Sequence, residues 1–240
     1  MGTVVLIDCD TLKYKNIEDL DEYKDRIDTI ISEIIHKTNA THYKCFLETR
    51  GNQTFRKIKD ASYKARRKRK ELHNMREIQD YIMEAYDPFI SAGVESDDSI
   101  ISTWRCLKDN YPLTEVYIAG NDKDYLTYPI KYIDLYHGRY LQQENISQED
   151  ADYNFMFQML SGDSADNISG VKGIGKVKAK KILDSCNGNK FSYIRTLLNL
   201  YRKQCKNNKL AERKLRLSYF MLRLKENVRC CKTFNDVVFS

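Results

Sequence analysis

Residues 162–183 read GDSADNISGVKGIGKVKAKKIL, a stretch that ends one helical pattern and starts another. Gly173 and Gly175 permit a tight turn, and the helix after this turn begins with free backbone N–H groups. Such a turn can bind a phosphate group, although a plain helix–helix turn contains the same glycines. The flanking lysines favour phosphate binding; those nearest to the turn are Lys172, Lys176, Lys178 and Lys180.

Upstream of this stretch, segments with strand and helix patterns alternate. This alternation indicates an α/β fold with a mostly parallel sheet flanked by helices. In such sheets, ligands bind beyond the carboxyl ends of the strands. Strands are expected at 4–8, 44–47, 116–119 and 132–135, and helices with 3.6-residue periodicity at 27–35 and 97–107.

Downstream, the sequence becomes helical. A helix precedes the glycine-rich stretch, and further helices are expected around 193–201 and 210–224. We therefore predict two domains. Residues 1–150 form the α/β domain, and residues 151–240 form a helical region that completes the site of the first.

The composition is that of a folded, basic protein. Apolar residues make up 42% of the 240 residues and there are only three prolines, which argues against disorder and against a flexible linker. No apolar stretch approaches the ~20 residues of a membrane span, and the chain does not open with a signal peptide. We expect a soluble, intracellular protein, in the cytoplasm or host-cell cytoplasm, without membrane contact.

The seven cysteines lack CxxC spacing and are accompanied by only four histidines. This pattern argues against a structural zinc site and for reduced thiols. Cys9 and Cys45 lie in strand-like runs, where a small buried side chain is expected. The adjacent Cys230 and Cys231 form a pair in which redox sensitivity is the minor interpretation.

Eight carboxylates stand in four short clusters, each where an apolar run ends or a helix begins. Helix capping or a surface turn explains any one cluster. Four such clusters are stronger evidence, because the fold can bring them together and like charges share a site only when cations neutralise them. The clusters are Asp8; Glu95, Asp97 and Asp98; Asp122 and Asp124; and Asp163 and Asp166.

Carboxylate oxygens suit hard divalent cations, and Mg²⁺ keeps several waters when it binds them. Two such ions about 4 Å apart can activate a water nucleophile and stabilise the leaving oxygen of a phosphodiester. The formal charge of the whole chain is nevertheless +6, which points to a polyanion as partner. Acidic clusters in a basic chain therefore predict metal ions that act on a polyanion.

A basic stretch supplies the complement to the acids. Residues 56–70 contain nine Lys or Arg and one Asp. Phe55 and Tyr63 lie among these cations, which suits phosphate contact combined with stacking on a base. A solvated helix face and a localisation signal are the competing interpretations, and we favour nucleic acid.

Five segments, in this order, resemble the 5′-nuclease (flap endonuclease-like) family, especially its small stand-alone bacteriophage members. The resemblance covers about residues 3–185. Its most specific part is close to the family's GDxxDNIxGVxGIG signature. The segments are LIDCD (6–10), FRKIKDASYKARR (55–67), GVESDD (93–98), NDKDYL (121–126) and GDSADNISGVKGIG (162–175).

The resemblance implies a PIN-like, Rossmann-like core, a helical arch at about 50–90 and a helix–hairpin–helix-like region that binds duplex DNA. It implies that the eight acids hold two or more Mg²⁺ ions, with Mn²⁺ as a substitute, and that the hairpin binds K⁺. Arg56 and Lys64 match basic residues that contact the scissile phosphate, and Tyr63 would stack on a base. The other implied DNA-binding residues are Arg66, Arg67, Lys172, Gly173, Gly175, Lys176 and Lys178.

Two positions depart from the family pattern. Where relatives often have an Asp before the arch, this chain has Glu48, which could serve a metal through a water. The opening motif usually continues as D-G-T/S-N, whereas here Asp8 is followed by Cys9, Asp10 and Thr11. Asp10 could cap a helix or act as an extra outer-sphere acid, and we expect the cap.

The implied activity is that of a monomeric, structure-specific 5′ nuclease. It would release 5′ flaps or short 5′ fragments from DNA or RNA·DNA hybrids, beside replication proteins. A PIN-type ribonuclease is one alternative, although such domains are typically shorter and lack the hairpin and the basic arch. A junction-binding protein without catalysis is another, although carboxylates without metal would oppose DNA binding.

Overall fold

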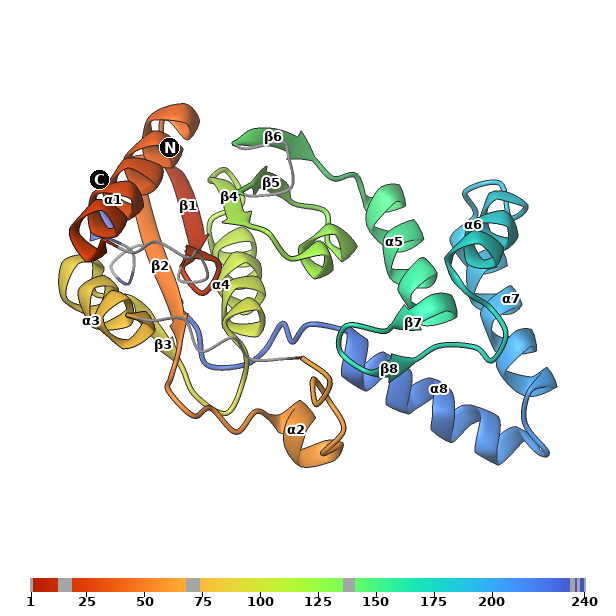
Figure 1. Cartoon of the computed structure of the whole chain (residues 1–240). Helices are drawn as coiled ribbons and strands as arrows, with labels where there is room; N and C mark the ends of the chain where they lie inside the picture. The colour runs from red at the N-terminus through yellow and green to blue at the C-terminus, as the bar shows by residue number, and fades with distance from the viewer. Residues whose placement is uncertain are drawn as a thin grey trace.

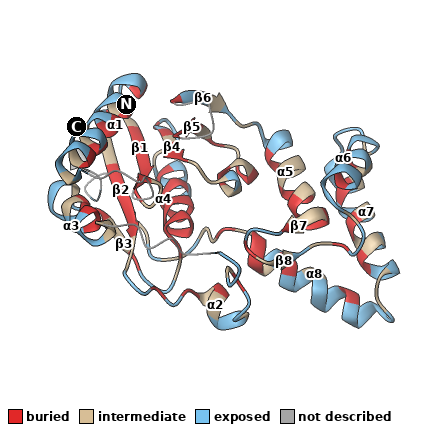
Figure 2. Cartoon of the chain, in the orientation of Figure 1, coloured by how far each residue is buried: buried red, intermediate tan, exposed pale blue. Residues whose placement is uncertain are grey.

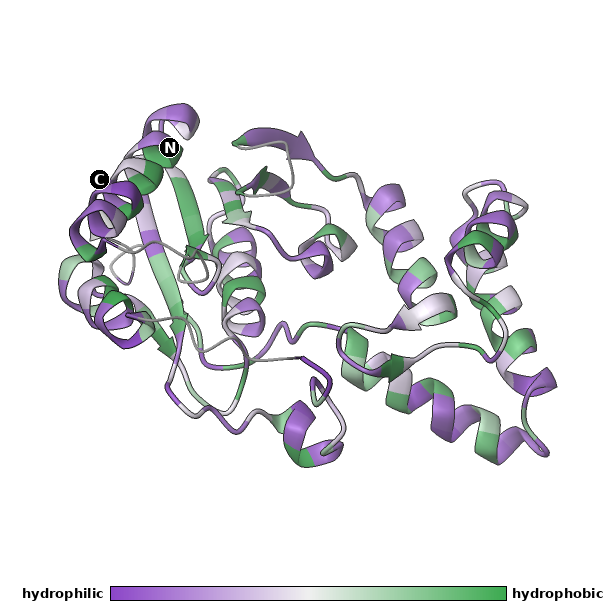
Figure 3. Ribbon diagram, viewed as in Figure 1, coloured by the Kyte–Doolittle hydropathy of each residue, from purple (hydrophilic) through white to green (hydrophobic). Residues whose placement is uncertain are grey.

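Strand β1, Thr3–Asp8, lies in the middle of a mostly parallel sheet (Figure 1). The computed structural model describes residues 2–12, 19–67, 74–135, 141–233, 236 and 238–239. Val4, Val5, Leu6 and Ile7 are completely buried, because helices cover both faces of the sheet. Strand β1 and the apolar part of β2 stand out in green in Figure 3.

The strand order in the described part of this sheet is β3-β2-β1-β4-β5-β6, with β9 also paired to β2. Strands β1 to β5 run parallel, whereas β6 and β9 are antiparallel to their neighbours. The strands are β1, β2 (His42–Glu48), β3 (Phe89–Ser91), β4 (Glu115–Gly120), β5 (Lys131–Asp134), β6 (Gln142–Asn145), β7 (Gly162–Asp163), β8 (Ile168–Ser169) and β9 (Val238–Phe239).

The helices cover the sheet and then form a separate group. Two hydrophobic cores lie on the two faces of the sheet, one under α1 and α3 and one under α4. The helices are α1 (Leu20–Thr38), α2 (Phe55–Lys59), α3 (Met75–Tyr86), α4 (Ser96–Asn110), the 3₁₀ helix η2 (Lys123–Thr127), α5 (Gln148–Ser161), α6 (Lys176–Asp184), α7 (Lys190–Lys203) and α8 (Asn208–Leu222).

Local sequence sets where these helices begin and end. Asp19 caps α1 by accepting hydrogen bonds from the backbone N–H groups of Asp21 and Glu22, at 2.8 and 3.1 Å. Asn39 ends the helix in the left-handed conformation, with φ of 49°. Figure 2 shows the result for the sheet layer: β1, β2, β4 and the facing side of α4 are buried.

Helices α5 to α8 surround a third core of their own. Between α5 and α6 the chain makes a short hairpin from β7 and β8. A side chain at either Gly162 or Gly170 has no room, since a Cβ at each would lie 2.3 Å from the backbone of the other. The two glycines therefore allow the tight crossing that carries the fourth acidic cluster, Asp163 and Asp166, back toward the sheet.

After α8 the chain returns to the α/β domain as a strap, which we define as residues 223–231 (Figure 1). Ser102 of α4 donates a hydrogen bond to the carbonyl of Lys225 at 2.8 Å, and Thr103 accepts one from the N–H of Cys231 at 3.2 Å. The sulfurs of Cys106 and Cys230 lie 3.5 Å apart. The strap thus holds α8 and α4 together.

The fold class predicted from the sequence is confirmed, and each of the four expected strands has its counterpart in β1, β2, β4 or β5. The expected helices correspond to α1, α4, α7 and α8, with α8 ending at Leu222. The proposed domain boundary at 150 falls in the first turn of α5, and the division into two domains stays a prediction. No described helix is long and apolar enough to cross a membrane.

The segment expected to form an arch, 50–90, is divided. Its end, α3, packs on α1: Ile78 and Ile82 are buried and the Tyr81 hydroxyl contacts Asp28 at 2.6 Å. Its start contains α2 and a series of turns up to Arg66. Residues 68–73, with the last cations of the basic stretch, lie outside the described residues. Only the part before α3 therefore remains as a candidate arch.

Candidate active site

The N-terminus of α4 carries three buried acids in four positions. Glu95 and Asp98 form a capping box, in which each side chain accepts a hydrogen bond from the backbone N–H of the other. The N-terminus of α4 therefore shows the helix capping and also the cluster of acids that the sequence predicted. Ligand oxygens of Glu95, Asp97 and Asp98 lie within 4.8 Å of one another. Burial, with Asp98 and Glu95 nearby, holds the pKa of Asp97 well above its usual value.

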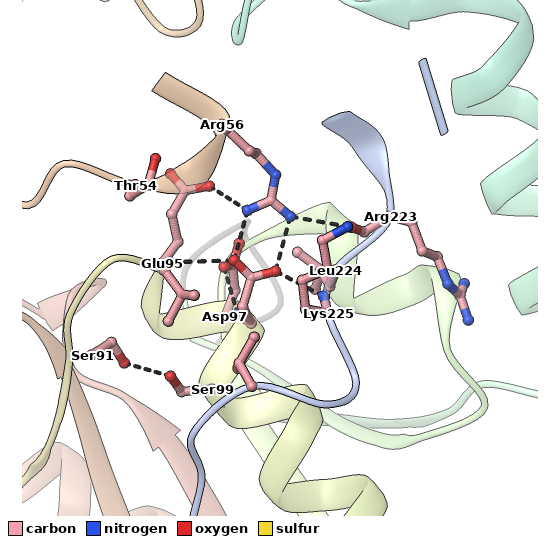
Figure 4. Close-up of polar contacts among 12 residues, drawn as sticks. Thr54, Arg56, Ser91, Glu95, Asp97, Ser99, Arg223, Leu224 and Lys225 are labelled. Atoms are coloured by element: carbon pink, nitrogen blue, oxygen red, sulfur yellow. Dashed lines mark hydrogen bonds and ion pairs between the residues drawn. The ribbon is translucent and has the colours of Figure 1, made fainter. Parts of the chain in front are cut away.

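Arg56 projects from α2 into this cluster and is 1% exposed (Figure 4). Its guanidinium donates to both oxygens of Asp98, at 2.7 and 2.9 Å, and to Glu95 at 2.9 Å. It also donates to the backbone carbonyls of Met221 and Arg223, at 2.9 and 3.2 Å. Burial alone would lower the pKa of Arg56, but the carboxylates, Asp98 first, raise it.

Both carboxylate oxygens of Asp98 accept two hydrogen bonds each. Besides Arg56, Asp98 accepts the N–H of Lys225 at 2.8 Å and that of Glu95 at 3.2 Å. All four hydrogen bonds hold α2, α4 and the strap together. A metal role for Asp98 and a phosphate role for Arg56 both stay predictions, and each would require these bonds to break. In this structure, Arg56 and Asp98 form a buried ion pair that connects α2, α4 and the strap, and we call this pair the clamp.

Lys64 occupies the space between two acid-bearing elements. Its ammonium contacts Glu95 and lies 3.9 Å from Asp166, and its backbone N–H donates to the Asp166 carbonyl at 3.0 Å. The residue has φ of 55°, a left-handed conformation that is uncommon outside glycine. Burial alone would lower the pKa of Lys64, but the nearby carboxylates, Glu95 first, raise it.

Tyr63 is buried and points at the same two acids. Its hydroxyl donates to Glu95 at 2.7 Å and to Asp166 at 3.2 Å. Burial and these carboxylates raise its pKa. For Glu95, burial alone would raise the pKa, but Lys64 and Arg56 lower it below its usual value. Tyr63 is only 5% exposed, so its ring presents no face to a base in this conformation, and base stacking stays a prediction.

The sheet edge contributes the next acids. Asp8 ends β1, and it accepts hydrogen bonds from Tyr125 at 3.0 Å and from Ser96, in the first turn of α4, at 3.2 Å. Burial, with Asp10 and Asp122 nearby, raises the pKa of Asp8 to about 7. Asp8 thereby joins β1 to the helix that carries Asp97.

Strand β4 leads into the second pair, Asp122 and Asp124. Asp122 caps η2 by accepting the N–H of Asp124 at 2.9 Å. Gln158 of α5 donates to Asp124 at 2.7 Å. Burial and the neighbouring Asp122 raise the pKa of Asp124 to about 8. The sheet and the helical region therefore meet at this carboxylate.

The β7–β8 hairpin between α5 and α6 carries the last pair of acids, Asp163 and Asp166. Lys123, between the two acids of the sheet edge, donates to Asp163 at 2.6 Å. Arg67 contacts Asp166, which is 4% exposed. Burial alone would raise the pKa of Asp163, but Lys123 lowers it. Lys64 and Tyr63 thus join Glu95 of α4 to Asp166 of the hairpin, and Lys123 joins η2 to Asp163.

The donor set fits hard divalent cations. It consists of carboxylate oxygens, several of them with raised pKa values because excess negative charge is buried there. The Oε1 atom of Gln158 is a buried acceptor without a hydrogen-bond partner among the described residues. Since the amide of Gln158 is held at Asp124, this oxygen is available to a cation or to its water.

Glu48 and Asp10 lie at the same edge of the sheet, where a hydrogen bond that the sequence did not predict joins them. Asp10 accepts a hydrogen bond from the backbone N–H of Glu48 at 2.9 Å. It therefore ties the end of β1 to the end of β2 and does not cap a helix through this contact. A metal role for Glu48 through a water stays a prediction.

The glycine-rich turn lies in the helical region, at the start of α6. Gly173 has φ of 77°, and a Cβ added at Gly173 or Gly175 would meet no atom within 4 Å, so the backbone there is open. Lys178 folds back onto the Gly173 carbonyl at 3.0 Å. The N–H of Lys172 donates to Gln204 at 2.9 Å, and Lys176 is exposed. DNA and K⁺ binding by this turn stay predictions.

Comparison with known proteins supports the same architecture. No established family profile matches the sequence. A 5′-3′ exonuclease of Mycoplasmopsis pulmonis is 33% identical over 100 residues, which are 39% of this chain and 33% of that protein. The chain thus matches about a third of the length of that relative.

Solved structures match over most of the chain. Bacteriophage T5 5′-exonuclease with divalent zinc ions has a TM-score of 0.65 at 18% identity, over 91% of this chain and 90% of that one. A T5 flap endonuclease complex with DNA and metal ions gives 0.64 at 19% identity, over 92% and 89%. The catalytic core of Rad2 with DNA gives 0.50 at 16%, over 90% and 70%. The chain has the fold of the 5′-nucleases.

In this 5′-nuclease fold, sequence reasoning missed several residues that complete the site. Lys123 was overlooked because it stands inside an acidic motif, although its position between two predicted ligands was a signal. Tyr125 and Gln158 were not singled out from the sequence, because their contacts to Asp8 and Asp124 depend on tertiary packing. Nothing in the sequence marks the strap as a partner of Arg56. Arg66 is exposed and lies beside the site cation Arg67.

Proposed function

We propose that this chain is a divalent-metal-dependent, structure-specific 5′ nuclease. It hydrolyses a phosphodiester near a junction between single-stranded and duplex DNA, as a 5′ flap endonuclease and a 5′-3′ exonuclease. The observation that carries the proposal is a set of cations that join acids of separate elements, in a chain with the 5′-nuclease fold. Lys64 contacts Glu95 and Asp166, and Lys123 binds Asp163. The matches to a 5′-3′ exonuclease and to nucleases solved with DNA support the reaction class.

The metal role belongs to the acids that have oxygens to spare. Asp8, Asp97, Asp122, Asp124 and Asp163 would hold two or more Mg²⁺ ions, or Mn²⁺ in their place, together with Glu95 and Asp166. Divalent ions bound there would lower the pKa of water and neutralise charge on the phosphate. Asp98 would support the site from behind, since Arg56 and two backbone N–H groups occupy its oxygens.

The basic side chains act on the substrate itself. Lys64 is 20% exposed and Arg67 48% exposed, so both reach solvent from the acid site and can donate to a phosphate that binds over it. Their charge opposes the charge that develops on the phosphate during cleavage. Tyr63 keeps a proton at its hydroxyl, because its pKa is raised, and orients Glu95. Arg56 positions α4 through Asp98.

Recognition in this proposal depends on DNA shape. The basic segment before α3 would contact a 5′ single strand, and the turn at Gly173 would hold the adjacent duplex through its backbone and neighbouring lysines. K⁺ at this turn belongs to the same proposal, and it would compete with Lys178 for the Gly173 carbonyl. RNA·DNA hybrids, replication proteins and a monomeric state are also part of it.

The test is cleavage of a 5′-labelled flap duplex with Mg²⁺, beside an EDTA control and the variant Asp122→Asn/Asp124→Asn. A matched variant, Asp25→Asn/Asp109→Asn, removes two exposed acids far from the site. We expect junction cuts that require Mg²⁺, survive in the matched variant and are lost in the site variant. Preferred cleavage of single-stranded RNA would instead identify a ribonuclease, and tight flap binding without any cutting would identify a junction-binding protein.

A further inference from the structure

Positive charge is concentrated in the last two helices and not only at the arch and the hairpin. Residues 190–222, which form α7, α8 and their connection, contain nine Lys or Arg against Glu212 alone, a net charge of +8. Since the whole chain carries +6, the remaining residues sum to −2. Residues 56–70 also carry a net charge of +8, so these two segments together account for the basic character of the protein.

On α8 the cations form a stripe along one side. Lys209, Arg213 and Arg216 follow each other at helical spacing and are all exposed, whereas Ala211 and Ser218, on the opposite side, are buried. Arg216 keeps 78% of its side chain exposed although it pairs with Glu212 at 2.6 Å. We call Lys209, Arg213 and Arg216 the α8 stripe.

One end of the α8 stripe adjoins the glycine-rich turn. The Gln204 side chain, in the connection between α7 and α8, accepts the N–H of Lys172 at 2.9 Å. Lys203 and Lys206 flank Gln204 and are exposed. The basic surface therefore continues from the turn through this connection onto α8.

The other end adjoins the candidate arch. Phe220, one turn beyond Arg216, packs edge-on against Phe55 of α2 with 5.3 Å between the ring centres. The ammonium of Lys225 lies over the Phe220 ring at 4.2 Å. The α8 stripe thus bridges the glycine-rich turn and the base of the arch.

A charged helix face is commonly no more than a solvated surface. Helix α1 of this chain is such a case, because it mixes five acids with three Lys or Arg. The α8 stripe differs in having one sign of charge and in connecting two other basic surfaces. Glu212 is the one acid in the sequence of α8, so most of the positive charge there is uncompensated and the cations repel one another. A polyanion that binds across them relieves this repulsion.

We propose that the α8 stripe, with Lys203 and Lys206, binds the phosphate backbone of duplex DNA as a third contact surface, beyond the turn and the arch. This proposal rests on the proposed function, because it takes DNA as the polyanion. The 15 residues of α8 extend for about 22 Å, which matches about six phosphate steps of one strand. The contact is independent of base sequence, since phosphates carry the interaction.

The experiment measures binding without cleavage. Lys209→Gln/Arg213→Gln/Arg216→Gln is compared with Arg26→Gln/Lys37→Gln/Lys108→Gln, which removes the same charge from exposed cations of α1 and α4. Fluorescence anisotropy with a long duplex in EDTA is recorded over a range of salt concentrations. We expect the α8 variant to lower the slope of log K against log salt by about 2.7, because three phosphate contacts are lost, and the control variant to leave it unchanged.

Two outcomes would overturn the proposal. Equal slopes for the two variants would leave the α8 stripe as a solvated surface. An equal loss on single-stranded DNA would assign the stripe to the single strand and not to the duplex. A third variant gives the opposite sign: Glu212→Gln removes the one acid of the helix and should tighten duplex binding. Failure of this proposal leaves Mg²⁺-dependent flap cleavage intact, whereas failure of the proposed function removes cleavage from the unmodified protein.

Discussion

Lys64 is the residue on which the two halves of the site depend. Its side chain contacts Glu95 from the α/β domain, and its backbone binds the Asp166 carbonyl of the helical region. A left-handed backbone and two neighbouring acids hold it in place. Removing the side chain takes away one cation that can face a phosphate but leaves the remaining basic surface unchanged.

We therefore expect Lys64→Ala to slow flap cleavage by about 10²- to 10³-fold, the usual effect of removing one preorganised donor. Binding of the same flap should change much less, since many other phosphate contacts remain. Single-turnover rates and anisotropy measure the two quantities. Lys108→Ala, which removes an exposed cation of α4, is the control. Equal losses of rate and affinity for Lys64→Ala would refute a catalytic role.

The raised pKa values of Asp8 and Asp124, about 7 and about 8, make stability depend on pH. Without metal, the folded protein binds protons there that the unfolded chain, with ordinary carboxyl pKa values near 4, has released. Unfolding free energy should therefore fall as pH rises from about 5 to 8, by up to about 1.4 kcal/mol per pH unit for each group.

Urea denaturation in EDTA at several pH values measures this decline. The same series with Mg²⁺ should show a stabilisation that grows toward pH 8, because cations bind the ionised carboxylates. The Asp122→Asn/Asp124→Asn variant should decline less in EDTA. A flat profile in EDTA would contradict the buried excess of negative charge.

At the scale of elements, α2 is a helix of five residues whose position is fixed by Arg56. The guanidinium joins α2, the N-terminus of α4 and the strap through five hydrogen bonds. A buried ion pair adds little net stability, but one partner left alone is costly. The clamp therefore affects stability mainly because its loss would leave a buried carboxylate without a cation.

We expect Arg56→Ala to lower the unfolding free energy by about 3–5 kcal/mol, because Asp98 would remain buried without its cation. Arg50→Ala, which removes an exposed pair with Asp80, should cost about 1 kcal/mol or less. Denaturant melts at neutral pH compare the two. Similar losses would show that the clamp has no special energetic role.

The clear periodic elements could be predicted from sequence, and the short ones could not. The run Val4 to Ile7 is fully apolar, so a buried parallel strand was readable. Strand β6 reads QQEN and β7 and β8 have two residues each, so neither pattern nor propensity marks them. The ends of β1 and β4 located their acids, because position along a strand fixes which edge a residue reaches.

The contacts within the site were harder to predict from the sequence. Arg56 binds carbonyls 165 and 167 positions away in sequence, and only the folded chain brings them together. Burial of Tyr63 has the same origin, since Glu95 and Asp166 lie 32 and 103 positions away. Spacing along the chain identified which side chains take part. It did not identify which of them would already be bound to one another.

At the scale of the whole molecule, the strap returns the chain from the helical region to the sheet. Arg223 lies over the Tyr128 ring at 3.8 Å, and Tyr128 donates to the Leu224 carbonyl at 2.6 Å. The N–H of Lys225 then reaches Asp98. The last strand, β9, pairs with β2. The relative position of the two halves thus depends on a segment without helix or strand.

We expect truncation after Leu222 to lower the melting temperature by roughly 5–10 °C, because several buried hydrogen bonds are lost together. Truncation after Lys232 keeps the strap and removes only the end of the chain, so it should have a smaller effect. Calorimetry compares the two. A larger loss from the shorter deletion would shift the importance to β9.

Lys64, Arg67 and Lys123 each sit on a carboxylate of the site, so the protein provides its own counter-ions. Lys64 and Arg67 can turn to a phosphate only when another cation takes over their carboxylates. Metal and DNA would then compete with the same internal pairs and thereby assist each other, and by linkage the assistance is equal in both directions. An enzyme with this arrangement would remain inactive until both metal and DNA are bound.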